Sequence, residues 1–380
     1  MSPSSIFNFE SLHGLTPRVP KALLIAAALV LTLELALRLA PDRWLLPYSS
    51  RLGLALYMEH EVLPRFDHPQ IAIFGTSRAA DAFSPVTLDE ALNLPPYSSV
   101  NLSIFSGRTN EWFNFYQRNR AKLSKVKVLV VAVDEWTFSS GVTADEQLSI
   151  SAPFIERWNF VQTGEAPPHP EESPDEKSKR AAATLDYMRT RRNLLLVDWL
   201  FQMRMKLAYL PKSILVSLHL AQRHESIALD ADRMVRSPGT EVESLKQAEN
   251  SPISRERIKN YYKHFNSHPL YIAYFEELAA LAKADGVRLL VLQMPNRRSY
   301  QNEVDKLFPE EYEQHIRVTR DLAAKVGASF KSAKFPEEIS ADGKTLTDAN
   351  YKDYGHMVPS GTDICTRWLA DIIKNEALLK

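Results

Sequence analysis

Short apolar runs alternate with amphipathic stretches over most of the chain. Five runs are apolar enough to form buried strands, at residues 71–74, 100–104, 127–133, 287–294 and 328–331. The run KVLVVAV at 127–133 is continuously apolar, which is typical of a parallel strand covered on both faces. Helical stretches at 111–123 and 272–284 lie between strands. The alternation predicts an α/β fold, a three-layer αβα arrangement around a parallel sheet.

An apolar run at residues 22–39 is about long enough to cross a bilayer core, which needs ~20 residues. Glu34 and Arg38 interrupt it four residues apart, where they can pair on one helix face. Trp44 follows, as aromatic residues do at a membrane interface. We expect residues 1–45 to form a cytoplasmic tail and a transmembrane anchor. A helix buried in the soluble domain is the alternative, and the basic residues at both ends leave the orientation open.

The rest of the chain predicts one domain with a long insertion. Residues 46–140 and 268–380 hold the alternating strand and helix pattern, so we assign both to the α/β domain. Residues 141–267 break that pattern with a stretch rich in Pro, Glu and Lys, which predicts a largely helical insertion with a flexible loop. Within it, residues 194–220 are apolar enough to pack on the domain as a helical cap or to lie at the membrane surface.

Composition excludes some functions without selecting one. The 46 Lys and Arg residues balance 46 Asp and Glu residues, so no overall field favours nucleic acid, and we expect none as a partner. The single cysteine, Cys365, cannot form an internal disulfide. No group of His and Cys has the spacing of a structural zinc site, so we expect neither a metal nor a cofactor.

The first candidate for chemistry is Ser77, in the sequence Gly-Thr-Ser-Arg that directly follows the strand at 71–74. Such a serine lies at the carboxyl edge of the sheet, where open α/β folds bind ligands. It also lies at the start of a helix, whose N–H groups can stabilise an oxyanion. The same pattern fits a helix cap or a phosphate-binding turn, so the motif alone leaves three uses open.

A second candidate lies near the end of the chain, where Asp353 precedes His356 in the sequence Asp-Tyr-Gly-His. A serine hydroxyl needs a base to remove its proton, and an imidazole needs a carboxylate to fix its tautomer. A capping role for Asp353 and a surface position for His356 are the structural alternatives. If the first and last loops of the sheet meet, Ser77 is the nucleophile, His356 the general base and Asp353 its orienting acid.

This order of motifs resembles the SGNH (GDSL-like) hydrolase superfamily, and in particular membrane-anchored members such as the DltD family and the alginate O-acetylation proteins. The resemblance covers residues 71–138 and 287–373 and implies a flavodoxin-like parallel sheet. It carries over the serine, aspartate and histidine named above. It adds Gly107, whose N–H group would join the oxyanion hole.

Two positions depart from that family pattern. Thr76 stands where an aspartate usually precedes the serine. Asp134 stands in the third block, where an asparagine side chain usually donates to the oxyanion. An ionised aspartate cannot take over that role, because a carboxylate has no proton to donate.

We interpret the second departure as an ion pair. Arg78 follows the serine and Asp134 follows the third strand, so the two side chains can meet at the sheet edge. The backbone N–H groups of the serine and of Gly107, aided by Asn101 or Asn110, would then hold the oxyanion. Separate, solvated side chains at both charged positions are the alternative.

The resemblance implies a serine acyl hydrolase or O-acyltransferase that forms an acyl-enzyme on esters of a cell-surface or exported polysaccharide. A membrane-bound acyl donor protein would be a partner. The catalytic domain would lie in the periplasm, anchored in the inner membrane by residues 22–39. One alternative is a non-catalytic glycan-binding or assembly subunit with the same fold, favoured by the altered third block. Another is an intracellular phosphate-binding domain that uses the turn at Gly75.

Overall fold

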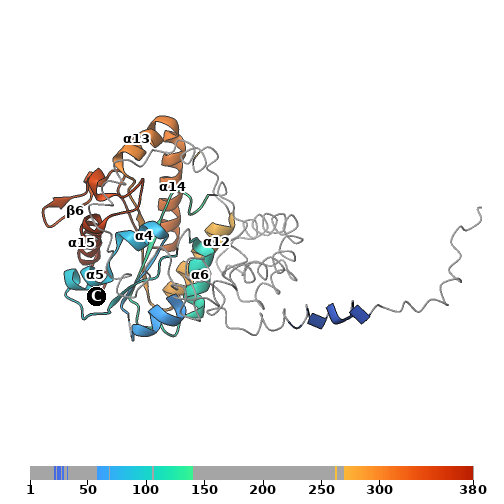
Figure 1. Cartoon of the computed structure of the whole chain (residues 1–380). Helices are drawn as coiled ribbons and strands as arrows, with labels where there is room; N and C mark the ends of the chain where they lie inside the picture. Colours follow the sequence, from blue (N-terminus) through green and yellow to red (C-terminus); the bar gives the residue numbers. More distant parts are fainter. Residues whose placement is uncertain are drawn as a thin grey trace, which may run out of the picture.

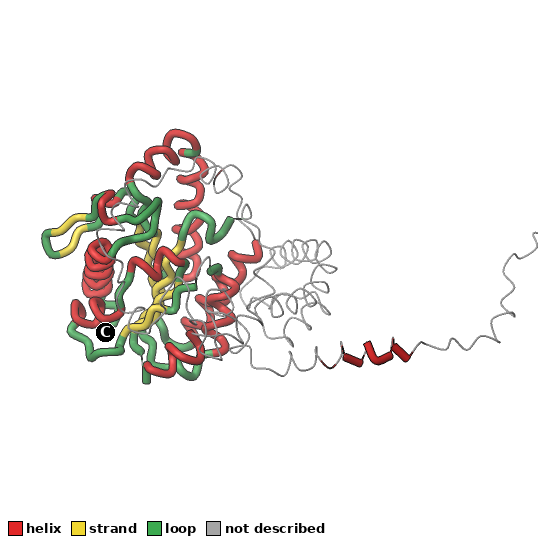
Figure 2. Tube along the Cα trace, viewed as in Figure 1, coloured by secondary structure: helices red, strands yellow, loops and turns green. Residues whose placement is uncertain are grey.

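The computed structural model describes scattered positions between 21 and 32, and residues 58–67, 69–104, 107–139, 262 and 269–379. Most of these segments form an α/β domain with a parallel sheet between two layers of helices (Figure 1). Figure 2 shows the strands of this sheet in yellow running through the middle of the domain, with helices in red on both sides.

Five parallel strands form the sheet, in the order β2-β1-β3-β4-β5. Their bounds are β1 Ile71–Phe74, β2 Ser99–Asn101, β3 Val128–Val133, β4 Arg288–Gln293 and β5 Ser329–Ser332. All five predicted strands are present, and their order is the one found in flavodoxin-like sheets. The second strand is shorter than predicted and ends at Asn101.

The predicted helices at 111–123 and 272–284 are present, with bounds that differ by up to five residues, whereas the helices at 85–92, 298–307 and 309–326 were not predicted. The bounds of the described helices are α4 Ser77–Ala82, α5 Pro85–Leu92, α6 Thr109–Arg118, α12 Pro269–Ala284, α13 Arg298–Leu307, α14 Pro309–Val326 and α15 Pro359–Asn375. Shorter elements complete the domain: η2 Met58–Val62, η3 Leu63–Arg65, η5 Pro336–Glu338, η6 Asp348–Asn350 and the hairpin of β6 Ser340–Ala341 with β7 Lys344–Thr345.

Successive side chains of β1 belong to opposite faces of the sheet. Ala72 and Phe74 pack in the core under α6, α12 and α14, whereas Ile71 and Ile73 pack in the core under α4, α5 and α15. Helices therefore cover both faces. This explains why β3 can be apolar at every position, since all of its side chains are buried.

The turn after β1 brings α4 directly onto the sheet. Gly75 follows the strand, and a Cβ atom there would lie 2.4 Å from Ala79 Cβ and 3.2 Å from Ala132 Cβ. Only glycine leaves room for this approach, which explains the glycine in the motif. As a result, Ser77 begins α4 at the carboxyl edge of the sheet.

Two of the predictions fall largely outside the described residues. The described positions of the apolar run at 22–39 are helical, and Leu24, Ile25 and Leu29 among them are exposed. Within the described part of the chain, no helix is both long and apolar enough to cross a membrane. The predicted insertion at 141–267 lies outside the described residues except for Tyr262.

Candidate active site

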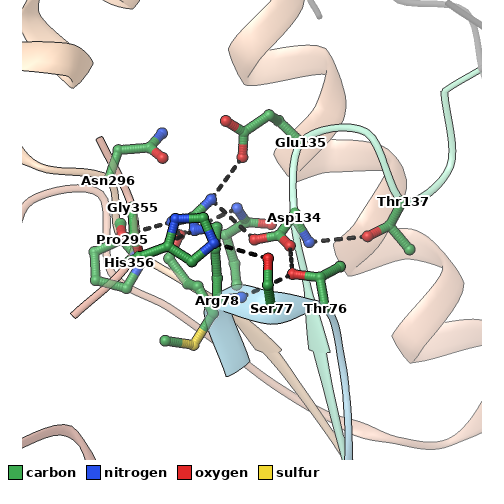
Figure 3. Close-up of polar contacts among 12 residues, drawn as sticks. Thr76, Ser77, Arg78, Asp134, Glu135, Thr137, Pro295, Asn296, Gly355 and His356 are labelled. Carbon is green, nitrogen blue, oxygen red and sulfur yellow. Dashed lines mark hydrogen bonds and ion pairs between the residues drawn. The ribbon is translucent and has the colours of Figure 1, made fainter. Parts of the chain in front are cut away.

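The predicted serine, histidine and aspartate meet at the carboxyl edge of the sheet. Ser77 Oγ lies 2.7 Å from His356 Nε2, and His356 Nδ1 lies 2.8 Å from Asp353 Oδ2. Both are hydrogen-bond distances. Figure 3 shows the imidazole facing the serine hydroxyl. The three side chains are therefore arranged as a nucleophile, a base and an orienting acid.

The two carboxylate oxygens of Asp353 have different partners. Oδ1 accepts the N–H groups of Gly355 and His356 at 2.9 and 2.8 Å, and Oδ2 faces the imidazole. Burial raises the pKa of Asp353, but the hydrogen bond and charge interaction with His356, with the two N–H groups, outweigh it and hold the pKa well below its ordinary value. An ionised Asp353 favours the proton on Nδ1, so the Nε2 lone pair faces Ser77.

Thr76, rather than Ser77, is the cap of α4. Its hydroxyl oxygen accepts the N–H of Arg78 at 3.2 Å, and its hydroxyl proton is donated to Asp134 Oδ2. The capping use that the sequence left open for the serine is therefore taken by its neighbour. The Ser77 hydroxyl is therefore available to His356. The backbone N–H of Ser77 is the first of the helix and has no intrahelical acceptor.

The predicted pair of Arg78 and Asp134 is present and fully buried. Arg78 Nη1 lies 2.9 Å from Asp134 Oδ1 and 2.9 Å from Glu135 Oε2 (Figure 3). The alternative of solvated charges is excluded, since all three side chains are at most 1 % exposed. Burial alone would lower the pKa of Arg78, but the two carboxylates raise it above its ordinary value. Burial also raises the pKa of Glu135.

Arg78 also donates to backbone carbonyl groups on two other loops. Nη2 lies 2.7 Å from the Pro295 oxygen and 3.4 Å from the Met294 oxygen, on the loop after β4. Nε lies 3.4 Å from the Gly355 oxygen, next to His356. The sequence did not predict these contacts, because a carbonyl acceptor has no signature in residue type. Glu135 had a weak signal, as the second acid directly after a buried strand.

Asn101 differs from its expected role as an oxyanion donor. Its Nδ2 donates to the carbonyl oxygens of Ala79 and Phe83 at 3.0 and 2.9 Å, and its Oδ1 accepts the Ser103 N–H at 3.1 Å. Both amide hydrogens are thus used to fasten α4 to the end of β2. The other candidate amide, Asn110, is buried in the first turn of α6.

Gly107 lies at the same edge, but its N–H group is already bonded. It donates to the Ile104 oxygen at 2.7 Å, while the Ile104 N–H and the Trp112 indole both bond the Gly75 oxygen. These contacts place the loop beside the turn that leads to Ser77. An oxyanion role for Gly107 would require its N–H to be shared or released. Of the two backbone donors predicted, the serine N–H is the one that the helix leaves open.

No model of a known protein family matches this chain, and no curated protein matches it in sequence. The class of this protein is therefore described by its fold and its site. The chain is an α/β protein with a five-stranded parallel sheet and a hydrogen-bonded serine, histidine and aspartate at the carboxyl edge.

Arg78→Met should destabilise the protein by about 3–5 kcal/mol, because it leaves Asp134 and Glu135 as buried carboxylates without their cation. Denaturant unfolding of the full chain measures this loss. Lys352→Met is the control, because it removes a partly exposed ion pair with Asp81 and should cost less than about 1 kcal/mol. An equally small loss for Arg78→Met would show that the buried pair does not stabilise the fold.

Proposed function

We propose that this chain is an SGNH-type serine acyl hydrolase or O-acyltransferase that acts on esters of a cell-surface or exported polysaccharide. The proposal places the catalytic domain on the extracytoplasmic side of the inner membrane, with a membrane-bound acyl donor protein as partner. The observation that supports it best is the relay from Ser77 Oγ through His356 to Asp353, with steps of 2.7 and 2.8 Å.

The first half-reaction transfers the acyl group to the protein. Ser77 Oγ attacks the carbonyl carbon of the ester, and its proton moves to His356 Nε2. The imidazolium is then stabilised by the Asp353 carboxylate, 2.8 Å from Nδ1. The negative charge on the carbonyl oxygen is stabilised by the Ser77 N–H at the start of α4. When the carbon–oxygen bond breaks, the leaving alkoxide takes the proton from Nε2, and an ester on Ser77 remains.

The second half-reaction decides between hydrolase and transferase. His356 Nε2 removes a proton from water or from a sugar hydroxyl, and that oxygen attacks the acyl-serine carbon. Collapse of the intermediate returns the proton to Ser77 Oγ and releases either a free acid or a new ester. The serine, histidine and aspartate serve both outcomes equally, so the acceptor that reaches the acyl-serine determines the reaction.

Ester turnover by the full chain in detergent tests the proposal. With p-nitrophenyl acetate, we expect a burst of p-nitrophenol that is stoichiometric with protein, and acetyl on Ser77 in the quenched sample. Ser84→Ala is a matched control, since Ser84 also lies at the start of a helix, as the residue before α5 that caps it by accepting the Thr87 N–H. It should keep the burst, whereas Ser77→Ala should lose it. A burst that survives Ser77→Ala would refute the proposal.

The membrane anchor is a separate part of the proposal. It is supported by the apolar run at 22–39 and by the exposed side chains of Leu24, Ile25 and Leu29. We expect the full chain to resist extraction from membranes by alkaline carbonate. Two aspartates, in Ile25→Asp with Leu29→Asp, should shift it to the extract, because an aspartate costs about 2.5–3.5 kcal/mol at the centre of a span, close to Leu29, and a smaller amount nearer its end. Equal extraction of both chains would contradict the anchor.

A non-catalytic glycan-binding or assembly subunit is the second candidate. The observation that favours it is the commitment of Asp134 to Arg78 and Thr76, which leaves no side-chain donor in the third block. Experiments with acceptor oligosaccharides distinguish the enzyme from the non-catalytic subunit. Binding without a burst favours the subunit, whereas a burst with an accelerated second phase favours the transferase.

A further inference from the structure

We propose that Arg78 is a positioning residue for this reaction: its guanidinium holds the loop that carries His356 in place against the helix that carries Ser77. The inference rests on the proposed function, because it concerns the same serine and histidine. The described hydrogen bonds and ion pairs of Arg78 run to two carboxylates and to backbone oxygens rather than to the Ser77 hydroxyl or the imidazole, so it acts through the backbone next to them.

One hydrogen bond of Arg78 links the residue after Ser77 to the residue before His356. Arg78 directly follows Ser77 at the start of α4, and Gly355 directly precedes His356. Arg78 Nε donates to the Gly355 oxygen at 3.4 Å. A shift of the guanidinium would therefore move the histidine loop relative to the serine, and the proton-transfer distance of 2.7 Å would change with it.

The guanidinium is held on its other sides by fixed partners. Asp134 and Glu135, on the turn after β3, bind Nη1, and the Pro295 oxygen, after β4, binds Nη2. A guanidinium is a planar group with a rigid fork of donors, so several bonds at once fix its orientation. A lysine could not reproduce this arrangement, because its ammonium is a single point of charge. One side chain thus joins α4 with loops after two strands and with the histidine loop.

Gly355 leaves room for the Arg78 side chain because it has no Cβ atom. A Cβ atom at this position would lie 2.4 Å from Arg78 Nε, 2.8 Å from Cζ and 3.0 Å from Cδ. The first two contacts are shorter than real Cβ atoms tolerate and the third is tight, so any other residue at position 355 must displace the guanidinium or the loop. The glycine of the Asp-Tyr-Gly-His motif is therefore explained by Arg78.

A second ion pair joins the same two segments and offers a matched comparison. Lys352, on the histidine loop, lies 2.6 Å from Asp81 in α4, with side chains 37 and 22 % exposed. Exposed pairs are screened by water and hold their geometry weakly. Arg78 is 0 % exposed. If Arg78 positions the loop, removing the buried pair and removing the exposed pair must have unequal effects.

The test compares Arg78→Met/Glu135→Gln with Lys352→Met/Asp81→Asn in the full chain in detergent. Each double variant removes one positive and one negative charge. The buried cluster therefore keeps its net charge in Arg78→Met/Glu135→Gln, and no further carboxylate is left without a cation. The readouts are the rate at which a fluorophosphonate labels Ser77 and the separate kcat and KM for p-nitrophenyl acetate. We expect the first variant to label about 100-fold more slowly, with a lower kcat and an unchanged KM. The second should label at the wild-type rate.

Gly355→Ala keeps the proposal testable if the first double variant does not fold. It retains both carboxylates and the guanidinium, and its added Cβ atom disturbs the contact between Arg78 and the histidine loop. It should also slow labelling at unchanged KM. Wild-type labelling by a folded Arg78→Met/Glu135→Gln chain, or equal slowing in both double variants, would overturn the positioning role. A wild-type chain that does not label would instead refute the proposed function.

Discussion

His356→Ala is expected to lower kcat for ester turnover by about 10⁶-fold, the loss that follows when a serine nucleophile has no base. Nε2 is the proton acceptor 2.7 Å from the Ser77 hydroxyl. Without it the serine is a neutral alcohol, which is a poor nucleophile at neutral pH. Steady-state kinetics with p-nitrophenyl acetate measure the change, and KM should remain close to the wild-type value.

The serine and the histidine should act as one unit. We therefore expect the double variant Ser77→Ala/His356→Ala to be no slower than either single variant. If the two losses multiplied, the residues would contribute through independent interactions. That result would be incompatible with proton transfer between Ser77 and His356.

Asp353→Asn should lower kcat by about 10⁴-fold while leaving the fold intact. An asparagine oxygen can still accept the N–H groups of Gly355 and His356, which Asp353 Oδ1 accepts now. Its amide nitrogen, however, would face Nδ1 as a donor and favour the tautomer that carries the proton on Nε2. The imidazole then presents a proton, rather than a lone pair, to Ser77.

The pH dependence follows from the lowered pKa of Asp353. A carboxylate whose folded pKa lies below its unfolded value, about 3.9, stabilises the fold above that value and loses the contribution as the pH falls through the folded pKa. Asp353 is therefore ionised throughout neutral and mildly acidic conditions. Protonation of Asp353 should thus contribute nothing to the pH dependence of wild-type kcat between about pH 8 and pH 5. A carboxyl signal of Asp353 that titrates within this range, followed by NMR, would contradict this assignment.

An exposed carboxylate provides the control for Asp353→Asn. Asp363 pairs with Arg367 four residues later in α15, with side chains about one third exposed. Asp363→Asn should leave both kcat and its pH profile unchanged. A loss comparable to that of Asp353→Asn would mean that turnover depends on general charge rather than on the orientation of His356.

The sheet and the three candidate catalytic residues could be predicted from the sequence for a simple reason. Buried parallel strands are continuous apolar runs, as in β3, and the carboxyl ends of such strands lie at one edge. A serine directly after β1 therefore had a defined place. The Asp353 and His356 pair could be placed beside it because the order of strands brings the early and late loops together.

The supporting contacts could not be predicted, because most of them involve backbone groups. Asn101 fastens α4 through two carbonyl oxygens, and the Gly107 N–H is bonded within its own loop. The sequence does not show which backbone carbonyl oxygens will accept these hydrogen bonds. The ion pair of Arg78 and Asp134 was predictable, since both charges flank strand ends. The additional contact of Glu135 with Arg78 was not predictable, because it depends on the conformation of the turn after β3.

Fluorophosphonate labelling of the full chain, located by mass spectrometry of its peptides, shows directly whether Ser77 is an activated nucleophile. A single modified residue, Ser77, is expected, with labelling abolished in Ser77→Ala and slowed by orders of magnitude in His356→Ala. An unlabelled wild-type chain, or a label carried by another residue, would contradict the assignment of Ser77 as an activated nucleophile.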